Sequence, residues 1–312
     1  EQERDVATGA VGVRTVSNTD VDRIPSPGPG GDLVSYLQAL PGMTMTGGRG
    51  GQLRIRGGTP SQNLVLVDNL PVTKPFHISN LFSAFPQDVI QSAELHAGGF
   101  GAKHLGATSG VVDVRLRPGN MKRYSGSAAV SPYLASVRVE GPLETDRQSF
   151  LAMGRTSLLR ESAPVLAGDE VPLTFSDALG RYSIQAEDFY CNATGMYTSD
   201  RGRISSLRRA RMAWSNTVIG GRCVGFDEWF PQPFDVTIGY TNFQNEETAG
   251  GETERSARLS QLYAKINLQN DLFGLPIEYG FDTKLLTYSA TLAERFTTLE
   301  TFDIPTEVIR VY

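Results

Sequence analysis

The sequence lacks any apolar run long enough to cross a membrane as a helix. Hydrophobic residues make up 40% of its 312 residues, but no run approaches the ~18–20 consecutive apolar residues that a membrane helix needs. This excludes only helical membrane proteins. The strands of a membrane β-barrel alternate apolar and polar residues over about ten positions, and their average hydropathy is unremarkable.

An excess of basic residues is also missing. The chain has 29 Lys and Arg against 34 Asp and Glu, which gives a formal net charge of −5. Nucleic-acid-binding domains usually carry a basic surface, so no nucleic-acid partner is predicted. Glycine is abundant instead, with 33 residues, which favours turns and close backbone approaches over long helices.

Residues that could hold a metal or carry catalysis are scarce. The three histidines, His77, His96 and His104, do not have the spacing of metal ligands, and Cys191 and Cys223 fit no zinc motif. Whether the two cysteines form a disulfide or lie unpaired in strands stays open at this point. We find no catalytic constellation, so we predict no metal, no cofactor and no enzyme.

The stretch Gly50–Asn69, GGQLRIRGGTPSQNLVLVDN, predicts two short strands, Gln52–Arg56 and Leu64–Val67, joined by a loop over Gly57–Asn63. Both alternating positions of the second strand are apolar, so we expect it to be buried on both faces. The glycines let the loop turn sharply, and Pro60 rules out a continuous strand through it.

The flanking segments predict a small α+β unit. Asp32 can cap a short helix whose apolar residues fall on one face, and Pro41 and Gly42 end it. The apolar residues of this helix are Leu33, Tyr36, Leu37 and Leu40. Further strands are expected at Ser92–His96 and Val111–Arg117.

From about Tyr124 the chain becomes a series of alternating segments separated by turn residues. Aromatic residues recur near the ends of these segments, as in the girdles of a membrane barrel. The same alternation would suit a soluble β-sandwich. We predict strands at 124–131, 133–140, 148–156, 179–186, 189–198, 210–224, 234–245, 256–269, 276–291 and 305–312.

Several of these motifs occur together in one known family. DLVSYLQALPG at residues 32–42, IRGG and VLVDNLPV after it, and DVIQSAELHAGGFGAKHLGATSGVVDVRLRPGN at residues 88–120 resemble the plug domain of TonB-dependent outer-membrane receptors, in the form typical of Bacteroidota-like bacteria. The resemblance covers about residues 11–120. Lys103–Gly106 stands where the family usually has an aromatic residue before the glycine.

The resemblance implies a membrane β fold, with a small mixed α+β plug domain followed by antiparallel transmembrane β-barrel strands. We divide the chain into an N-terminal lead-in with the first plug strand (1–31), a plug domain (32–120) and a partial β-barrel of about ten strands (121–312). A barrel that encloses a plug has about 22 strands. We therefore expect the barrel to be incomplete, with the chain being a fragment or a second polypeptide completing the wall.

The resemblance also implies that outward loops of the plug form a substrate site together with the barrel lumen. By position these loops are Gly57–Asn63 and Thr73–Ile78, and Lys103 and His104 belong to a third. Lys74 and His77 are the strongest candidates because Pro75 stiffens their loop. The candidate substrate-binding residues are Thr59, Gln62, Asn63, Lys74, Phe76 and His77, with Phe76 as a stacking surface.

In this family some plug arginines pair with barrel glutamates, and the resemblance assigns that role here to Arg54, Arg56, Arg115 and Arg117. An ion pair in a wet lumen contributes only ~0–1 kcal/mol. Such pairs would hold the plug and still let it leave.

The implied function is TonB-dependent active import across the bacterial outer membrane, with substrate bound above a plug that inner-membrane energy coupling displaces. The implied partners are a TonB-like periplasmic protein, outer-membrane lipid or lipopolysaccharide, and a surface lipoprotein or other complex subunits. The alternative is a non-transporting plug/barrel component of a multi-protein assembly, suggested by the short barrel and the lack of a recognisable TonB box. Substrate identity stays open.

Overall fold

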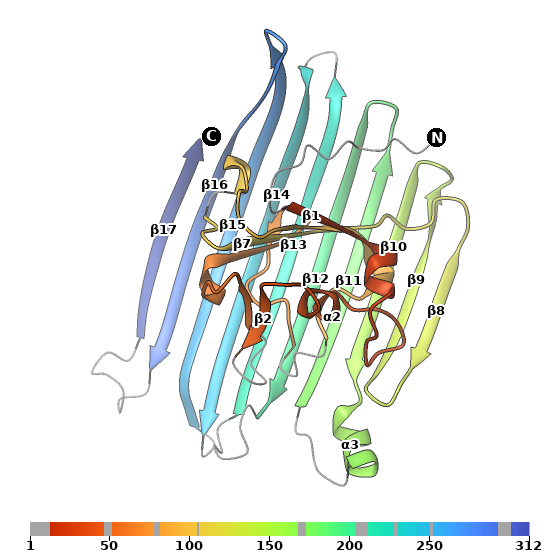
Figure 1. Ribbon diagram of the computed structural model, residues 1–312, viewed down its shortest axis with the longest axis vertical. Coiled ribbons are helices and arrows are strands. Elements are labelled where there is room, and N and C mark those ends of the chain that lie inside the picture. Colours follow the sequence, from red (N-terminus) through yellow and green to blue (C-terminus); the bar gives the residue numbers. More distant parts are fainter. Residues whose placement is uncertain are drawn as a thin grey trace.

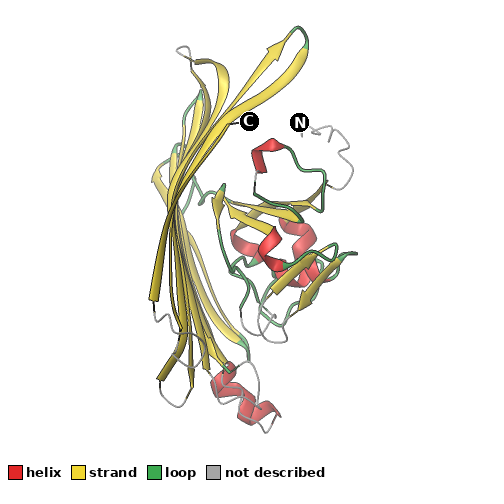
Figure 2. Ribbon diagram, turned by 90° about the vertical axis from the view of Figure 1, so that its left-hand side faces the viewer, coloured by secondary structure: helices red, strands yellow, loops and turns green. Residues whose placement is uncertain are grey.

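The computed structural model describes residues 13–46, 52–77, 82–104, 106–167, 173–203, 211–227, 230–249, 252–292 and 301–311. A long curved sheet forms one layer, and a smaller folded unit lies against its concave side (Figure 2). We call the smaller unit, from β1 to β7, the plug, and the large sheet, from β8 to β17, the wall.

The plug is a small mixed α+β unit with a five-stranded sheet and a separate two-stranded sheet of β2 and β3 (Figure 1). Its strands are β1 (Val13–Ser17), β2 (Met43–Thr46), β3 (Gln52–Ile55), β4 (Asn63–Val67), β5 (Leu70–Pro71), β6 (Ile90–His96) and β7 (Gly110–Leu116). Its helices are α1 (Asn18–Asp22), α2 (Leu33–Gln38) and the 3₁₀ turns η2 (Pro60–Gln62), η3 (Gln87–Val89) and η4 (Ala102–His104). Among the described residues, no helix is long and apolar enough to cross a membrane.

The plug sheet has the order β1-β6-β7-β4-β5, with β4 parallel to β7. The expected cap of α2 is confirmed, since the Asp32 side chain accepts the N–H of Val34 at 3.0 Å. Of the two strands expected in Gly50–Asn69, β3 pairs with β2 and not with its successor β4. Strand β4 is followed by a two-residue turn at Asp68 and Asn69, whose φ angles are 48° and 70°. This left-handed pair is the geometry of a tight hairpin to β5.

The wall is a ten-stranded antiparallel sheet in which each strand pairs with its neighbours in sequence. Each of the ten predicted segments overlaps one of its strands, and the predicted fold class is confirmed. The strands are β8 (Ser125–Val130), β9 (Leu134–Glu144), β10 (Gln148–Ser157), β11 (Leu173–Gln185), β12 (Phe189–Gly202), β13 (Arg211–Asp227), β14 (Phe230–Ala249), β15 (Glu252–Leu272), β16 (Leu275–Leu292) and β17 (Thr301–Val311).

The two ends of the wall differ in their connections. At one end the turns are short, as at 145–147, 186–188 and 273–274, whereas at the other end the β10–β11 connection holds helix α3 (Leu159–Ala167) (Figure 1). Outer-membrane barrels have short periplasmic turns and longer extracellular loops. We therefore call the α3 end the loop end and the opposite end the turn end.

The two faces of the wall also differ. The convex face carries exposed apolar side chains in neighbouring strands, in rows that share the pairing register. Examples are Val137, Val139, Ile219, Ile238, Tyr240, Leu262, Ile266, Phe281 and Leu285. From Phe189 to Tyr197 this face extends roughly 27 Å along the strand at ~3.4 Å per residue, close to the ~25 Å band of outer-membrane barrels. We call it the apolar band.

One hydrophobic core continues from the plug into the wall. Buried plug residues such as Leu37, Val67 and Phe85 belong to the same cluster as Leu151 and Val218 of the wall. The plug is therefore packed against the wall and not loosely enclosed.

The two cysteines form a disulfide within the wall, because Cys191 on β12 lies opposite Cys223 on β13.

Candidate functional site: the contact between plug and wall

A buried histidine of the plug sits between two carboxylates of the wall near the loop end. His77 Nδ1 lies 3.0 Å from Asp200 Oδ2, and its Nε2 lies 3.1 Å from Asp177 Oδ2. The imidazole stacks on Phe175 of β11 with ring centroids 4.0 Å apart. His77 is only 1% exposed, so both of its nitrogens are used in holding the plug to strands β11 and β12.

Protonation makes this contact an ion pair. Burial alone lowers the pKa of His77, but the carboxylates of Asp177 and Asp200 outweigh it and raise the pKa to about 10. The imidazole is therefore a cation at neutral pH and donates through both nitrogens. Beside it, burial lowers the pKa of Lys74 to about 8 in spite of the nearby Asp200 carboxylate, and its ammonium lies 3.2 Å from the centroid of the Trp214 ring.

Arg155 of β10 extends the same network to the start of α2. Its guanidinium donates to Asp177 at 2.7 and 2.9 Å and to Asp32 at 3.3 Å, and it also contacts the carbonyl of Ser83. Asp32 in turn accepts the Ser83 hydroxyl at 2.7 Å and the Ser83 N–H at 2.9 Å. The helix cap that the sequence predicts is thus also a docking carboxylate for the wall.

A second buried ion pair involves the left-handed turn between β4 and β5. Arg181 of β11 pairs with Asp68, and Thr194 donates its hydroxyl to the same carboxylate at 2.9 Å. Asp68 and Arg181 are 2% and 5% exposed. The turn geometry pushes this carboxylate out of the plug sheet, which explains why an Asp follows the apolar strand β4.

The neighbouring turn residue makes the third contact. The Asn69 amide donates to the Asp235 carboxylate at 3.3 Å and to the Thr237 hydroxyl at 3.3 Å, both on β14. Asp235 is held by two hydrogen bonds of 2.8 Å from Arg222. Two consecutive residues of one turn therefore bind strands β11 and β14.

Apolar packing at the same turn depends on two wall glycines. A Cβ placed at Gly220 would lie 2.5 Å from a methyl carbon of Leu70, and one at Gly239 would lie 2.4 Å from the other methyl carbon. Any larger residue would push the plug off the wall at this point. The facing glycines of β13 and β14 thus leave the space that the Leu70 side chain occupies.

At the turn end, the last plug residue before the wall makes a charged pair. Arg117 donates to Glu140 of β9 at 2.6 and 3.0 Å, and its Nε donates to the carbonyl of Asp88 at 2.6 Å. The family resemblance implies a plug–barrel pair for this arginine, and in the structure its partner Glu140 lies on the wall.

Arg115 differs from that expectation. Arg115 pairs with Asp113 of the plug at 2.8 Å and donates to Asn69 at 3.0 Å, so its partners are internal to the plug. Arg54 is half-buried on β3, and Arg56 is exposed with a positive φ of 47°.

The expected substrate-loop residues separate into two groups. Thr59, Gln62 and Asn63 stabilise their own loop, because Gln62 caps Thr59 at 2.8 Å and Asn63 donates to the carbonyl of Leu53 at 2.7 Å. The expected stacking surface at Phe76 is not exposed, since this ring is 3% exposed in the core. Lys74 and His77 face the wall, as described above.

Sequence reasoning missed most of the partners. We expected arginines on the plug and glutamates on the barrel, whereas two of the buried pairs have aspartates on the plug (Asp32, Asp68) and arginines on the wall (Arg155, Arg181). The alternation of the wall strands did indicate that these two arginines face the plug. Both wall arginines occupy positions in alternating strands whose neighbours on the same face are buried.

A polar cavity of about 230 Å³ lies beside this contact, towards the turn end. Plug residues Lys103, His104 and Asp113 line it on one side, and wall residues such as Lys265 and Glu278 line it on the other. The Lys265 ammonium donates to the carbonyl of Lys103 at 2.7 Å. Burial and the nearby His96 lower the pKa of His104 to about 3, so this imidazole is neutral at the cavity wall.

The family assignment comes from comparison with known proteins. Residues 10–111 match the family model described as TonB-dependent Receptor Plug Domain. A probable TonB-dependent siderophore receptor, PirA of Acinetobacter baumannii, is 24% identical over 63% of this chain and 30% of its own length.

Two solved structures share the fold. The siderophore receptor PirA from Pseudomonas aeruginosa aligns over 97% of this chain and 52% of its own, with 19% identity and a TM-score of 0.65. The alcaligin receptor FauA from Bordetella pertussis aligns over 95% and 50%, with 13% identity and a TM-score of 0.67. The chain thus spans about half the length of these receptors.

These relatives are described as receptors, in agreement with the lack of a catalytic constellation in the sequence. The match to the plug model, the ten-stranded wall and its apolar band all agree with a plug domain packed against part of a membrane β-barrel. Residues 10–111 match the TonB-dependent receptor plug domain, and the described chain shares the fold of about half of the outer-membrane siderophore receptors with which it aligns.

Proposed function

We propose that the receptor to which this chain belongs imports ferric siderophores across the outer membrane by energy-coupled movement of the plug. The substrate class comes from the PirA relatives, whose descriptions name siderophore receptors. The proposed energy source is a TonB-like protein that pulls on the plug from the periplasm. A non-transporting structural role is not favoured, because the relatives are receptors.

The observation that carries the proposal is the position of the plug. It lies on the concave side of a wall whose convex face is apolar (Figure 2). Charged and polar side chains join the two parts through His77, Asp68 and Asn69. A folded unit held inside a membrane wall by polar contacts can block a passage and be moved when a force breaks those contacts.

Tethering the plug tests whether it must move. The Lys103 ammonium lies 3.8 Å from the Glu278 carboxylate of β16, so Lys103→Cys and Glu278→Cys place two thiols within reach of a short bifunctional thiol reagent. Cys191 and Cys223 are consumed in a disulfide, so within this chain the introduced thiols are the free ones. Uptake of a radioactive ferric siderophore by intact cells should stop after cross-linking.

Each single-cysteine variant treated with the same reagent is the matched control and should keep its uptake rate. Binding of the ferric siderophore to the cell surface should survive the tether, because the outer side of the wall is unchanged. Uptake at the wild-type rate with the plug fully cross-linked would refute plug movement. Equal uptake in cells with and without the energy-coupling protein would refute energy coupling.

A further inference from the structure

The disulfide of the wall lies on its convex face. On β12, Cys191 occupies the same alternate positions as the exposed residues Phe189 and Tyr197. The next residue, Asn192, is buried on the inner face. Cys223 lies directly opposite Cys191 on β13, and both cysteines are half-buried. The two sulfur atoms are therefore on the side of the wall that faces away from the plug.

Apolar side chains flank the disulfide on both sides. The pairing register of strands β11 to β16 places one residue of each strand in the same cross-strand row. The members of this row are Ile184, Cys191, Cys223, Val236, Ile266 and Phe281. Ile266 and Phe281 are exposed on the convex face, so the row belongs to the apolar band.

The disulfide lies inside the apolar band and not at its turn-end border. One row closer to the turn end, three of the strands carry aromatic residues, as in the girdle that marks the interface of a membrane barrel. These residues are Phe189, Phe234 and Tyr279. At ~3.4 Å per residue, Cys191 lies roughly 7 Å further into the band than Phe189.

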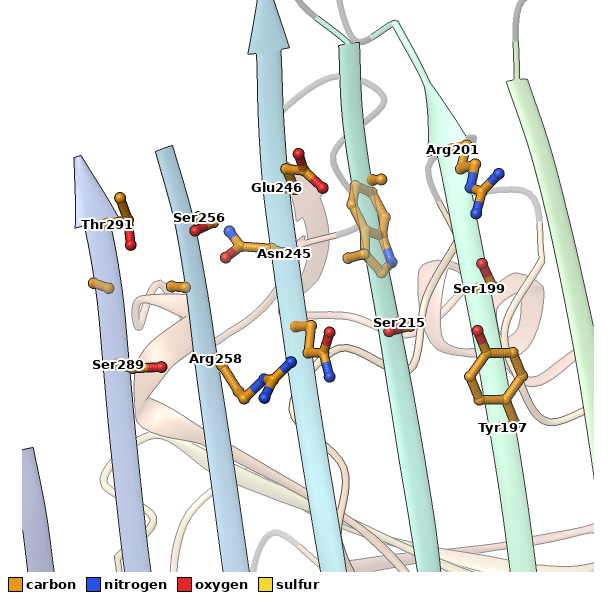
Figure 3. A pocket seen from close by; sticks show the side chains of 15 residues that line it. Tyr197, Ser199, Arg201, Ser215, Asn245, Glu246, Ser256, Arg258, Ser289 and Thr291 are labelled. Carbon is orange, nitrogen blue, oxygen red and sulfur yellow. The ribbon is translucent and has the colours of Figure 1, made fainter. Parts of the chain in front are cut away.

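The loop-end border of the band is further away. Beyond Tyr197 the convex face becomes polar, with Ser199 and Arg201 on β12 and Ser215 on β13 (Figure 3). Along β12, Cys191 is roughly 20 Å from Tyr197 at ~3.4 Å per residue. Both borders therefore place the disulfide at the level of acyl chains.

The formation of a disulfide needs conditions that acyl chains do not provide. The thiolate is the attacking form of cysteine, and a charged group is costly in the interior of a bilayer. A water-soluble oxidant also has no access to that depth. Once the wall lies in the membrane, the two thiols can neither ionise readily nor meet an oxidant.

We propose that Cys191 and Cys223 are oxidised in the aqueous periplasm, before the wall enters the outer membrane, by a protein that carries a reactive disulfide. The thiolate of one cysteine attacks this disulfide, forms a mixed disulfide and releases one thiolate of the oxidant protein. The thiolate of the other cysteine then attacks the sulfur of the first, forms the Cys191–Cys223 bond and expels the second oxidant thiolate. The receptor loses two protons and two electrons, and the oxidant protein becomes a dithiol.

The register of the two strands adds a condition to this step. The thiols meet when β12 and β13 pair as in the finished wall, because a shift of one residue turns a side chain to the other face. The β12–β13 pair is therefore formed before insertion, and the disulfide then fixes its register. The inference depends on the outer-membrane location that accompanies the proposed function, but not on import. Heat unfolding exposes the disulfide again, so an unfolded receptor is open to reductants.

Receptor that enters the membrane in the reduced form gives the first test. Cells are grown with a thiol reductant, the reductant is removed, and oxidised glutathione is added to the isolated outer membranes. Alkylation and peptide mass spectrometry then measure the free thiols of Cys191 and Cys223. This pair should be oxidised at least about tenfold more slowly than a control pair in contact with water.

The matched control carries Cys191→Ser and Cys223→Ser together with Glu144→Cys and Gln148→Cys. Glu144 and Gln148 are also opposite each other on neighbouring strands, but they lie at the exposed turn between β9 and β10. Equal oxidation rates of the two pairs would overturn the proposal. Failure of the reduced receptor to reach the membrane would support it, because insertion would then require the disulfide.

A second test follows the wild-type protein alone and so does not depend on the folding of a variant. After a short pulse of radioactive methionine, samples are alkylated at intervals, and each is separated into receptor that urea extracts from the membrane and receptor that resists extraction. The disulfide should already be present in the extractable receptor, which has not yet inserted. A disulfide that appears only in the resistant receptor would overturn the proposal. Siderophore uptake enters neither test, so a failure of import would leave this inference standing.

Discussion

Replacing His77 with alanine should loosen the plug more than any other single change in the loop-end network. The side chain neutralises Asp177 and Asp200 from a position that is 1% exposed. Its pKa rises from 6.5 to about 10, and at 1.36 kcal/mol per unit this corresponds to about 3–5 kcal/mol of stabilisation. The cost of breaking a buried ion pair from one side is of the same size, about 3–5 kcal/mol.

The assay is urea unfolding of the receptor in detergent, followed through hydrogen exchange of plug amides. His77→Ala should lower the free energy of plug unfolding by about 3–5 kcal/mol at pH 7. His96→Ala is the matched control, because His96 is also buried in the plug but its hydrogen bond, at 3.3 Å, goes to Glu94 of the plug and not to the wall. His96→Ala should lower the free energy of plug unfolding by less than about 1.5 kcal/mol.

The pH dependence supplies an independent check with a definite sign. A raised histidine pKa gives stability that is complete below 6.5 and is lost as the pH rises through the folded-state pKa of about 10. The wild-type plug should therefore lose stability between about pH 6.5 and pH 10, and His77→Ala should show a flatter curve there. The reasoning is refuted if the two curves are parallel in this window, or if His77→Ala costs no more than His96→Ala.

Three further changes test other contacts of the plug and the wall. Gly220→Ala should displace Leu70 and weaken plug docking by about 1–3 kcal/mol. Gly180→Ala is the control and should leave plug docking unchanged, because the space around Gly180 is open. Urea unfolding of the plug measures both variants. Arg181→Met should cost about 3–5 kcal/mol in the same assay because it leaves a buried carboxylate unpaired, and a loss below 1 kcal/mol would contradict this. Cys191→Ser should lower the thermal midpoint of the wall and remove its sensitivity to reductant, since a disulfide typically contributes about 2–4 kcal/mol.

Local features of the fold were predictable because each has a local physical cause. Asp32 could be assigned as a cap from its place before an apolar helical face, and the structure confirms the bond to Val34. The wall strands could be predicted because apolar side chains are exposed on one face while the other face packs on the plug, which imposes alternation along each strand.

The contacts between plug and wall were not predictable in the same way. Arg155 and Asp32 are joined across 123 residues of sequence, and nothing in either local pattern names the other as its partner. His77 lay in a polar loop with Pro75 and was expected to face substrate, but the charged groups that bury it belong to two wall strands. Long-range pairing of this kind depends on the register of the whole sheet.

The contact between plug and wall has buried ion pairs and a polar cavity beside them, and this combination explains how the plug can be held firmly and still be moved. Breaking a buried pair such as Asp68–Arg181 costs about 3–5 kcal/mol while one partner stays dry, yet the same pair is worth only ~0–1 kcal/mol once water surrounds it. The polar cavity between Lys103 and Glu278 already separates plug from wall on the side of β15 and β16. A pull that widens this cavity lets water reach the Asn69–Asp235 contact first, since Asn69 and Asp235 line it. Asp68 is the adjacent residue of the same turn, so its pair with Arg181 would be hydrated next, and we expect plug release to proceed from β15 towards β10.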